Sequence, residues 1–284
     1  VQSGTMSATD TGNEGYSVII DNGGSTPMVQ VDAGAILDYS GTVTTAATLR
    51  VAPNEYDCSI DNAGTIKQGT NATNGYAVLI DHIGWSDIVF NNTGIIQGKF
   101  SYTGNGFGDN VYLNVDDDGE INGSVTGPTN GADRLFLQFG LTTPVTNFTT
   151  GGTMDHVQGI QVGGTNSIVN INNAVTNLLS SLQVDANATV NVNAAITGTA
   201  TTLNNGTMYL YSGGSIGTSG IFTNNHRLNL STAFAIPAGF VNTTGDIFII
   251  DAGGSMSNNL TAGSSLTVGK DSDGNNYTDT NYTT

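Results

Sequence analysis

Short segments in which apolar and polar residues alternate recur along most of the chain. Clear examples are "VNVN" at 190–193, "MYLY" at 208–211 and "RLNLS" at 227–231. Alternation with a period of two residues is typical of a strand with one buried face. We find no window of about 12 residues with the 3.6-residue apolar spacing of an amphipathic helix. The pattern therefore predicts an all-β protein built from many short strands.

The strand-like segments belong to internal repeats of roughly 19 to 30 residues. "IDNAGTI" at 60–66 returns 30 residues later as "FNNTGII", and "GDNVYL" at 108–113 returns 24 residues later as "ADRLFL". Each repeat is too short to bury its own apolar row and must stack on its neighbours. The repeats therefore predict a parallel β-solenoid with irregular rungs. A sandwich or Greek-key barrel is the alternative, and it would require hairpin turns.

The same pattern predicts the domain organisation and the core. Residues 1–270 form one solenoid domain, with a protruding loop or a seam near 141–156, and 271–284 are a polar tail or a calcium loop. We expect Tyr209 and Tyr211 to face outward and Phe136 and Phe248 to lie in the core. The expected core ladder consists of aliphatic side chains, among them Val190, Val192, Met208, Leu210, Leu228 and Leu230.

Composition and charge exclude several classes of partner. Among 284 residues there are six Lys and Arg against 23 Asp and Glu, so the formal net charge is −17. Nucleic acids and anionic membrane surfaces are bound by clustered basic residues, so we expect neither as a partner. The longest apolar runs, such as 76–80, are too short to span a bilayer. An acidic surface does suit divalent cations.

Three consecutive aspartates, Asp116, Asp117 and Asp118, are the most conspicuous candidate site. Strand-like residues precede them and Ile121 begins the next apolar segment, so we expect a solvated turn between two strands. Catalysis would need several carboxylates converging with a base or a cation. The histidines and the basic residues are instead scattered singly, and the lone Cys58 is expected to be a buried side chain. We therefore expect no enzymatic activity and no catalytic residues.

Calcium is the one cofactor for which the sequence carries a signal. In "DSDGNNYTD" at 271–279, Asp271, Asp273, Asn275 and Asp279 take positions 1, 3, 5 and 9 of an oxygen-ligand calcium loop. The glycine falls at position 4 rather than 6, and a simple polar tail is the alternative. "GNGFGDNVY" at 104–112 approaches the calcium-binding nonapeptide of β-roll proteins, but it is not repeated in tandem.

Two stretches carry a resemblance to a known class of protein. "DNAGTIKQG" and "NNTGIIQGK" share an Asn-x-Gly-x-Ile unit, at Asn62, Gly64 and Ile66 and again 30 residues later, and "GEINGSVTGPTNGADRLFLQFG" at 119–140 follows them. These segments resemble the passenger portion of bacterial autotransporter proteins. The resemblance covers the first half of the chain well and the second half through looser rungs. It implies a right-handed parallel β-helix, secretion to the cell surface, and a role in adhesion or aggregation.

The expected function is that of a secreted, non-enzymatic surface protein that serves adhesion or contacts extracellular matrix. Its partners would be a protein or a glycan of a host or a neighbouring cell. A self-assembling filament or surface-layer subunit, stacked end to end and stabilised by calcium, is the alternative, because uncapped terminal rungs expose strand edges. A polysaccharide-active β-helix enzyme is a further and weaker alternative.

Overall fold

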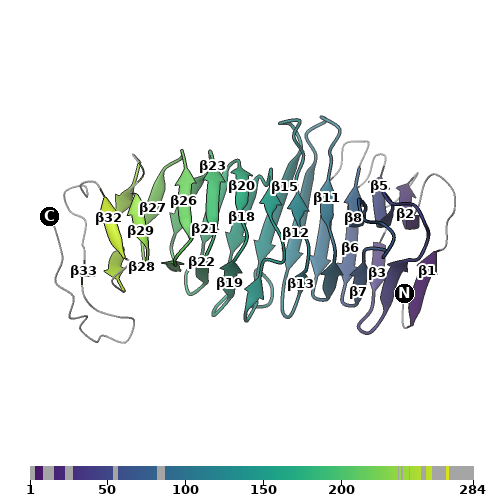
Figure 1. Ribbon diagram of the computed structural model, residues 1–284, viewed down its shortest axis with the longest axis horizontal. Helices are drawn as coiled ribbons and strands as arrows, with labels where there is room; N and C mark the ends of the chain where they lie inside the picture. The colour runs from purple at the N-terminus through teal and green to yellow at the C-terminus, as the bar shows by residue number, and fades with distance from the viewer. Residues whose placement is uncertain are drawn as a thin grey trace.

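The chain winds into a rod of stacked parallel strands, as a computed structural model shows (Figure 1). The structure describes residues 4–8, 16–22, 28–53, 57–81, 87–235, 237, 239–242, 244–250, 254–257 and 267–268. Every strand pairing in this part of the chain is parallel, and no helix occurs in it. The β-solenoid is therefore confirmed, and the sandwich alternative, which needs antiparallel hairpins, is excluded.

Three strands make one turn of the solenoid, and each joins a different face of the rod. One face begins with β1 (Thr5–Ala8), β4 (Ile36–Tyr39), β7 (Thr65–Lys67), β10 (Ile95–Gln97) and β13 (Glu120–Ile121). It continues with β16 (Phe148–Thr149), β19 (Ile168–Ile171), β22 (Thr189–Val192), β25 (Thr207–Leu210), β28 (Arg227–Leu230), β31 (Asp246–Ile249) and β33 (Thr267–Val268). We call the first sheet A and its continuation sheet D.

The second face is sheet B, which nine strands form. They are β2 (Tyr16–Asn22), β5 (Ala47–Pro53), β8 (Tyr76–Ile80), β11 (Phe100–Tyr102), β14 (Val125–Thr126), β17 (Met154–Asp155), β20 (Val175–Leu178), β23 (Ala195–Gly198) and β26 (Ser215–Thr218). Two further strands pair with each other as a small sheet near the C-terminal end, β29 (Ala233–Ala235) and β32 (Ser255–Ser257).

The third face is sheet C, the longest ladder, which ten strands form. They are β3 (Met28–Val31), β6 (Cys58–Asn62), β9 (Ile88–Asn92), β12 (Asn110–Val115), β15 (Arg134–Phe139), β18 (Gly159–Val162), β21 (Ser181–Val184), β24 (Thr201–Asn204), β27 (Phe222–Asn224) and β30 (Val241–Asn242). Its register shows that the turns shorten along the rod. Met28 pairs with Ser59, 31 residues on, whereas Thr223 pairs with Val241, 18 residues on.

The core is a continuous stack of inward side chains that runs the length of the rod. In β12 the burial alternates strictly, with Val111, Leu113 and Val115 inside. The six aliphatic residues that the sequence assigns to the ladder, from Val190 to Leu230, are all fully buried, so that prediction is confirmed. Because each fully buried aliphatic side chain contributes roughly 1.5–3 kcal/mol, this stack is the main favourable term in folding.

The prediction that Phe136 and Phe248 lie in the core is wrong. In β15 the inward positions are Leu135, Leu137 and Phe139, so Phe136 alternates onto the outer face, where its ring stacks on Tyr112. Phe248 is likewise only half-buried, and the guanidinium carbon of Arg227 lies 4.4 Å from its ring centroid. Strand parity decides which way a side chain points, and local hydrophobicity does not. Tyr209 and Tyr211 are half-buried and their rings stack, as outward residues should.

Buried asparagines form two ladders at the end of sheet C. Asn62 donates from Nδ2 to Oδ1 of Asn92 at 2.7 Å. Asn204 donates in the same way to Asn224, and Asn224 to Asn242, at 2.7 Å each. The side chains of all five are almost completely buried. Because a buried amide is costly unless its hydrogen bonds are made, the rungs must stay in register for these amides to pair.

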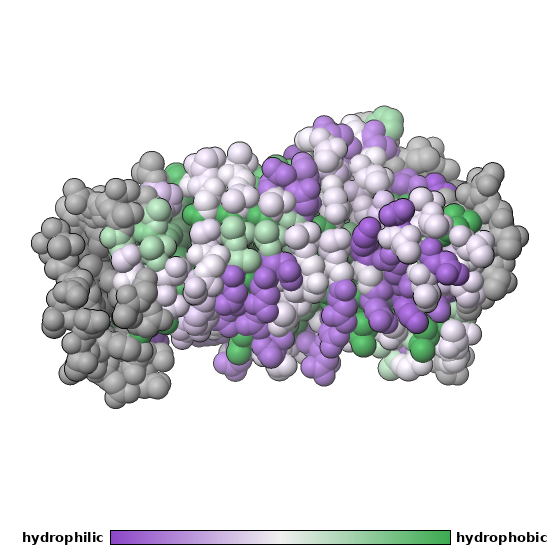
Figure 2. Space-filling model, viewed as in Figure 1, coloured by the Kyte–Doolittle hydropathy of each residue, from purple (hydrophilic) through white to green (hydrophobic). Residues whose placement is uncertain are grey.

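The outer faces are largely polar, which matches the acidic, amide-rich composition. On sheet C, Asn91 donates to Asp61 at 2.8 Å and Asn114 to Asn91 at 2.9 Å, one rung apart each time. On sheet D, Asn170 donates to Asn147 and Asn191 to Asn170, both at 2.7 Å. Figure 2 shows that hydrophobic side chains on the face in view form small separate spots rather than one broad patch. Among the described residues, no helix is long and apolar enough to cross a membrane.

Candidate functional site

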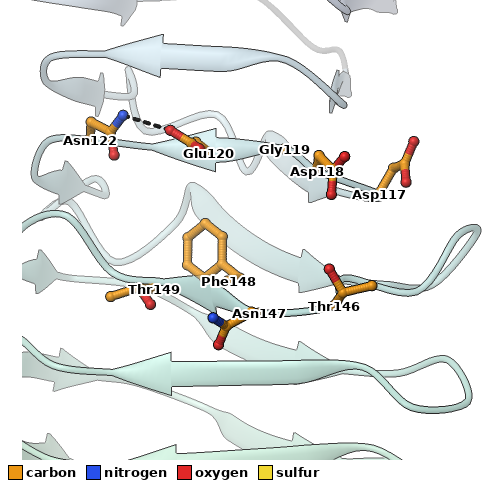
Figure 3. Close-up of a pocket in the computed structure, with 9 residues that line it drawn as sticks. All are labelled: Asp117, Asp118, Gly119, Glu120, Asn122, Thr146, Asn147, Phe148 and Thr149. Carbon is orange, nitrogen blue, oxygen red and sulfur yellow. Dashed lines mark hydrogen bonds between the residues drawn. The ribbon is translucent and has the colours of Figure 1, made fainter.

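The largest hollow on the rod lies where sheet A gives way to sheet D. Strand β13 pairs with β10, and β16 pairs with β19, but β13 and β16 do not pair with each other. The gap between them opens a hollow of about 530 Å³. Its lining residues, drawn in Figure 3, are Asp117, Asp118, Gly119, Glu120, Asn122, Thr146, Asn147, Phe148 and Thr149.

The two strands touch at one end and separate at the other. Gly151 donates its backbone N–H to the carbonyl oxygen of Ile121 at 3.2 Å. A Cβ on Gly151 would lie 2.5 Å from that oxygen, so only glycine permits this approach. In sheet B the corresponding turn, from Val125 to its partner Met154, takes 29 residues, whereas the next turn, from Met154 to Val175, takes 21. The longer turn lets the two strands diverge and leaves a wedge. The stretch 141–156, which stands out as a seam in the sequence, forms one side of it.

The three aspartates before β13 have different roles. Asp116 is 8% exposed, and its Oδ1 accepts hydrogen bonds from the backbone N–H groups of Thr142 and Thr143 at 3.0 and 3.1 Å. Asp117 has a φ of 55° and, with Asp118, is exposed at the tip of the turn. The expected inter-strand turn is confirmed. Asp116, however, is a buried carboxylate that fastens the 141–146 loop onto the preceding rung.

The remaining carboxylates of the wedge do not converge on one point. Figure 3 shows Asp117, Asp118 and Glu120 spread along one side of the hollow, with Asn147 and Thr149 on the other. Glu120 accepts a hydrogen bond from Nδ2 of Asn122 at 2.9 Å. Within the described ranges, no group of three or more His, Cys, Asp or Glu side chains is arranged to hold a metal ion. The wedge therefore offers dispersed hydrogen-bonding groups and negative charge.

The calcium-like nonapeptide at 104–112 is organised around a carboxylate of the chain itself. Oδ2 of Asp133 accepts from the backbone N–H groups of Asn105 and Gly106, and Oδ1 accepts from those of Gly108 and Asp109. The side chain of Asn130 donates to Oδ2 at 2.6 Å. The loop thus presents donors to an anion, which is the opposite of what a cation needs. This loop and the neighbouring 127–133 loop project above the rod in Figure 1.

Asp133 is held as a carboxylate by this loop. Burial by itself would raise the pKa of Asp133, because it disfavours the charged form. The hydrogen bonds from Gly106, Asn130, Gly108 and Asp109 outweigh burial and lower the pKa to about 2. Nothing in the sequence pattern separates Asp133 from a surface aspartate. The available signal is its position immediately before a strand and one rung beyond a glycine-rich loop.

Other titratable residues are engaged in structural contacts. Asp155 accepts hydrogen bonds from Thr176 and Asn177 at 2.6 and 2.9 Å, and Nδ1 of His156 lies 2.9 Å from its Oδ2. Burial raises the pKa of Asp155, but these hydrogen bonds lower it further than burial raises it. Cys58 is a buried free thiol, as the sequence predicts, and burial raises its pKa to about 11. A thiol with so high a pKa is a poor nucleophile at neutral pH.

The calcium ligands that the sequence suggests, Asp271, Asp273, Asn275 and Asp279, lie outside the described residues, so this prediction stays a prediction. Comparison of the chain with protein-family models, with curated proteins and with solved structures finds no match. The assignment of function therefore rests on the rod itself and on its surfaces.

Proposed function

We propose that the chain is a secreted, non-enzymatic surface protein whose stiff β-solenoid binds extracellular partners through its outer faces, in the manner of an autotransporter passenger. One observation carries this proposal. Like side chains repeat at the spacing of the rungs along the outside of the rod, as in the Asp61, Asn91 and Asn114 ladder. A surface with that repeat suits an extended, repetitive polymer of matrix or cell wall better than a small substrate.

The rigidity of the rod supports the same function. Its backbone hydrogen bonds run between successive turns, and the buried amide ladders hold those turns in register. A rod of this kind presents many weak contacts at fixed spacing, so that several can form together. Avidity then replaces the need for one deep pocket, which fits the open, wedge-shaped form of the largest hollow.

Adhesion of coated beads tests the proposal directly. Beads carrying the folded chain should be retained on surfaces coated with matrix proteins or with cell-wall polysaccharides, and should resist washing. Beads carrying the same chain after heat denaturation are the control, because they keep the composition and charge but lose the spacing of the ladders. Equal retention of the two kinds of bead on every surface would contradict the proposal.

A filament subunit is the second candidate, and the N-terminal end of the rod favours it. Strands β1, β2 and β3 each end their sheet, and within the described residues each pairs on one side only. An unpaired strand edge is a template for another chain. Electron microscopy of the purified protein, with and without a calcium chelator, distinguishes the candidates. Long filaments support the subunit, and uniform rods of single-molecule length count against it.

A further inference from the structure

A row of four residues on the outer face of sheet C contains two stacked rings followed by two small residues. Tyr112, Phe136, Gly159 and Ser181 occupy equivalent positions on β12, β15, β18 and β21. The rings of Tyr112 and Phe136 are 5.2 Å apart between centroids and inclined by 11°. The ring of Phe136, which the sequence alone places in the core, is therefore part of an outward aromatic stack.

The stack ends at Gly159 because glycine has no side chain to continue it. A Cβ at this position would lie 3.3 Å from Cδ1 of Phe136 and 2.8 Å from Oγ of Ser181. Any larger residue would thus fill the space beside the phenylalanine ring. In its absence a hollow of about 260 Å³ remains, with Tyr112 and Phe136 at one end and Ser181 at the other.

A row of glutamines lines the hollow beside the rings. Gln138, Gln161 and Gln183 lie in register on three successive rungs. Gln161 and Gln183 donate from Nε2 to the two oxygens of one carboxylate, that of Asp185, at 2.8 and 2.6 Å. The shared acceptor fixes the orientation of both amides before any ligand arrives. Each amide keeps an oxygen with which to accept a hydrogen bond.

We propose that this surface, the Phe136 hollow, binds a pyranose ring of a neutral glycan. The apolar C–H face of a sugar packs on an aromatic ring, and its hydroxyls pair with the neighbouring amides. None of the residues that line the hollow is charged, and the chain carries a net charge of −17, so anionic glycans and nucleic acids are disfavoured. The proposal deepens the proposed surface-binding function by naming the partner class and the residues that contact it.

The size of the hollow indicates how the glycan is held. Pockets that enclose drug-sized ligands usually measure about 300–1,000 Å³, and this hollow is smaller and open. It therefore takes one edge of a polymer and leaves the chain of sugars to run over the surface. We expect a weak single-site affinity, with Kd on the order of 1 mM, that becomes useful through repetition along a polymer.

Affinity electrophoresis tests the proposal with the whole chain. Native gels would contain hydroxyethyl cellulose, galactomannan, mannan or arabinoxylan, with polygalacturonate as the anionic comparison. We expect retardation of the wild-type protein in at least one neutral gel and none in polygalacturonate. Phe136→Ala should weaken that retardation at least fivefold, and Gln161→Ala should weaken it about twofold to fivefold.

Tyr209→Ala is the matched control, because Tyr209 is also an outward stacked ring but lies on sheet D. It should leave retardation unchanged. Gly159→Ala, which fills the hollow without removing a ring, keeps the test valid if Phe136→Ala does not fold, and it should also weaken retardation. Folding of each variant is checked by its thermal transition.

Several results would overturn the proposal. Retardation only in polygalacturonate contradicts the charge argument, and equal retardation of wild type and folded Phe136→Ala in a neutral gel shows that the glycan binds elsewhere. In the second case the proposed surface-binding function survives while this site fails. No retardation in any gel, together with bead retention on matrix proteins, likewise removes the glycan and leaves the adhesive function. Loss of both removes the function as well.

Discussion

The corner that follows sheet C is built in two ways, and the two ways occupy different stretches of the rod. At the asparagine corners the strand ends in Asn62, Asn92, Asn204 or Asn224, and two residues lead to the next strand. At the aliphatic corners the strand ends in Val115, Phe139, Val162 or Val184, and four to eight residues follow. The buried terminal residue therefore changes with the length of the turn.

Hydrogen bonding explains the difference. A two-residue turn has few polar groups of its own, and the asparagine supplies the missing donors. Asn204 donates both to Asn224 and to the carbonyl oxygen of Arg227 in the next rung, at 2.7 and 2.8 Å. The longer turns are fastened by other groups, such as Asp116 onto Thr142 and Thr143. Backbone polar groups at a buried corner must be paired, and the two constructions are alternative ways to pair them.

Exchange of the corner types should give the largest effect. Val162→Asn places an amide between Phe139 and Val184, neither of which can pair with it. We expect a loss of about 3–5 kcal/mol, because the amide is buried without partners and an aliphatic contact is lost. Denaturant unfolding measures the total, and hydrogen exchange locates the loss at the central rungs. A loss below 1 kcal/mol would show that this corner tolerates an unpaired amide.

The glycine in an asparagine corner should be the next most sensitive position. A Cβ on Gly94 would clash with the carbonyl oxygen of Gly64 in the adjacent rung. We expect Gly94→Ala to cost about 3 kcal/mol, because the two turns are forced apart. Gly217→Ala is the matched control, since the nearest atom to its Cβ would be 3.7 Å away. Thermal unfolding of both variants gives the comparison, and equal shifts in Tm would contradict it.

The reverse exchange, Asn224→Val, should cost less than Val162→Asn. It removes one amide from the middle of a ladder and leaves Nδ2 of Asn204 with the Arg227 oxygen as its remaining acceptor. We expect a loss of about 2–3 kcal/mol, partly offset by the apolar side chain that valine buries. Increased hydrogen exchange should be confined to the rungs of Asn204, Asn224 and Asn242. Unchanged stability would mean that the ladder contributes nothing to the corner.

Acid should loosen the loop that Asp133 holds, with a smaller effect on the whole rod. Its folded pKa of about 2 lies below the ordinary value of 3.8, so its contribution to stability is complete above about pH 4 and is lost as the pH falls toward 2. Exchange of the Gly106 and Gly108 N–H groups should therefore accelerate over that range. Asp133→Asn should show fast exchange already at neutral pH and little further change. A pH-independent wild type would contradict this account of the loop.

The sequence predicts the rungs and the inward face of each strand because both follow from alternation and repetition. It does not predict the asparagine ladders, since a buried asparagine has the composition of a surface residue. The signal was present in the 30-residue offset between Asn62 and Asn92, which places two amides one above the other. Phe136 was misassigned because its strand, "RLFLQF", is apolar on both faces at that point. The wedge between β13 and β16 depends on turn lengths, and no local pattern encodes it.

The central claim is that the rod acts by binding through its faces and not by reacting. One co-sedimentation experiment tests it most directly: the protein is mixed with insoluble neutral polysaccharides, and the pellet and the supernatant are both assayed. The account predicts protein in the pellet, reduced by Phe136→Ala, and no new reducing ends in the supernatant. Release of reducing ends that Asp118→Asn abolishes would contradict it and would make the wedge an active site.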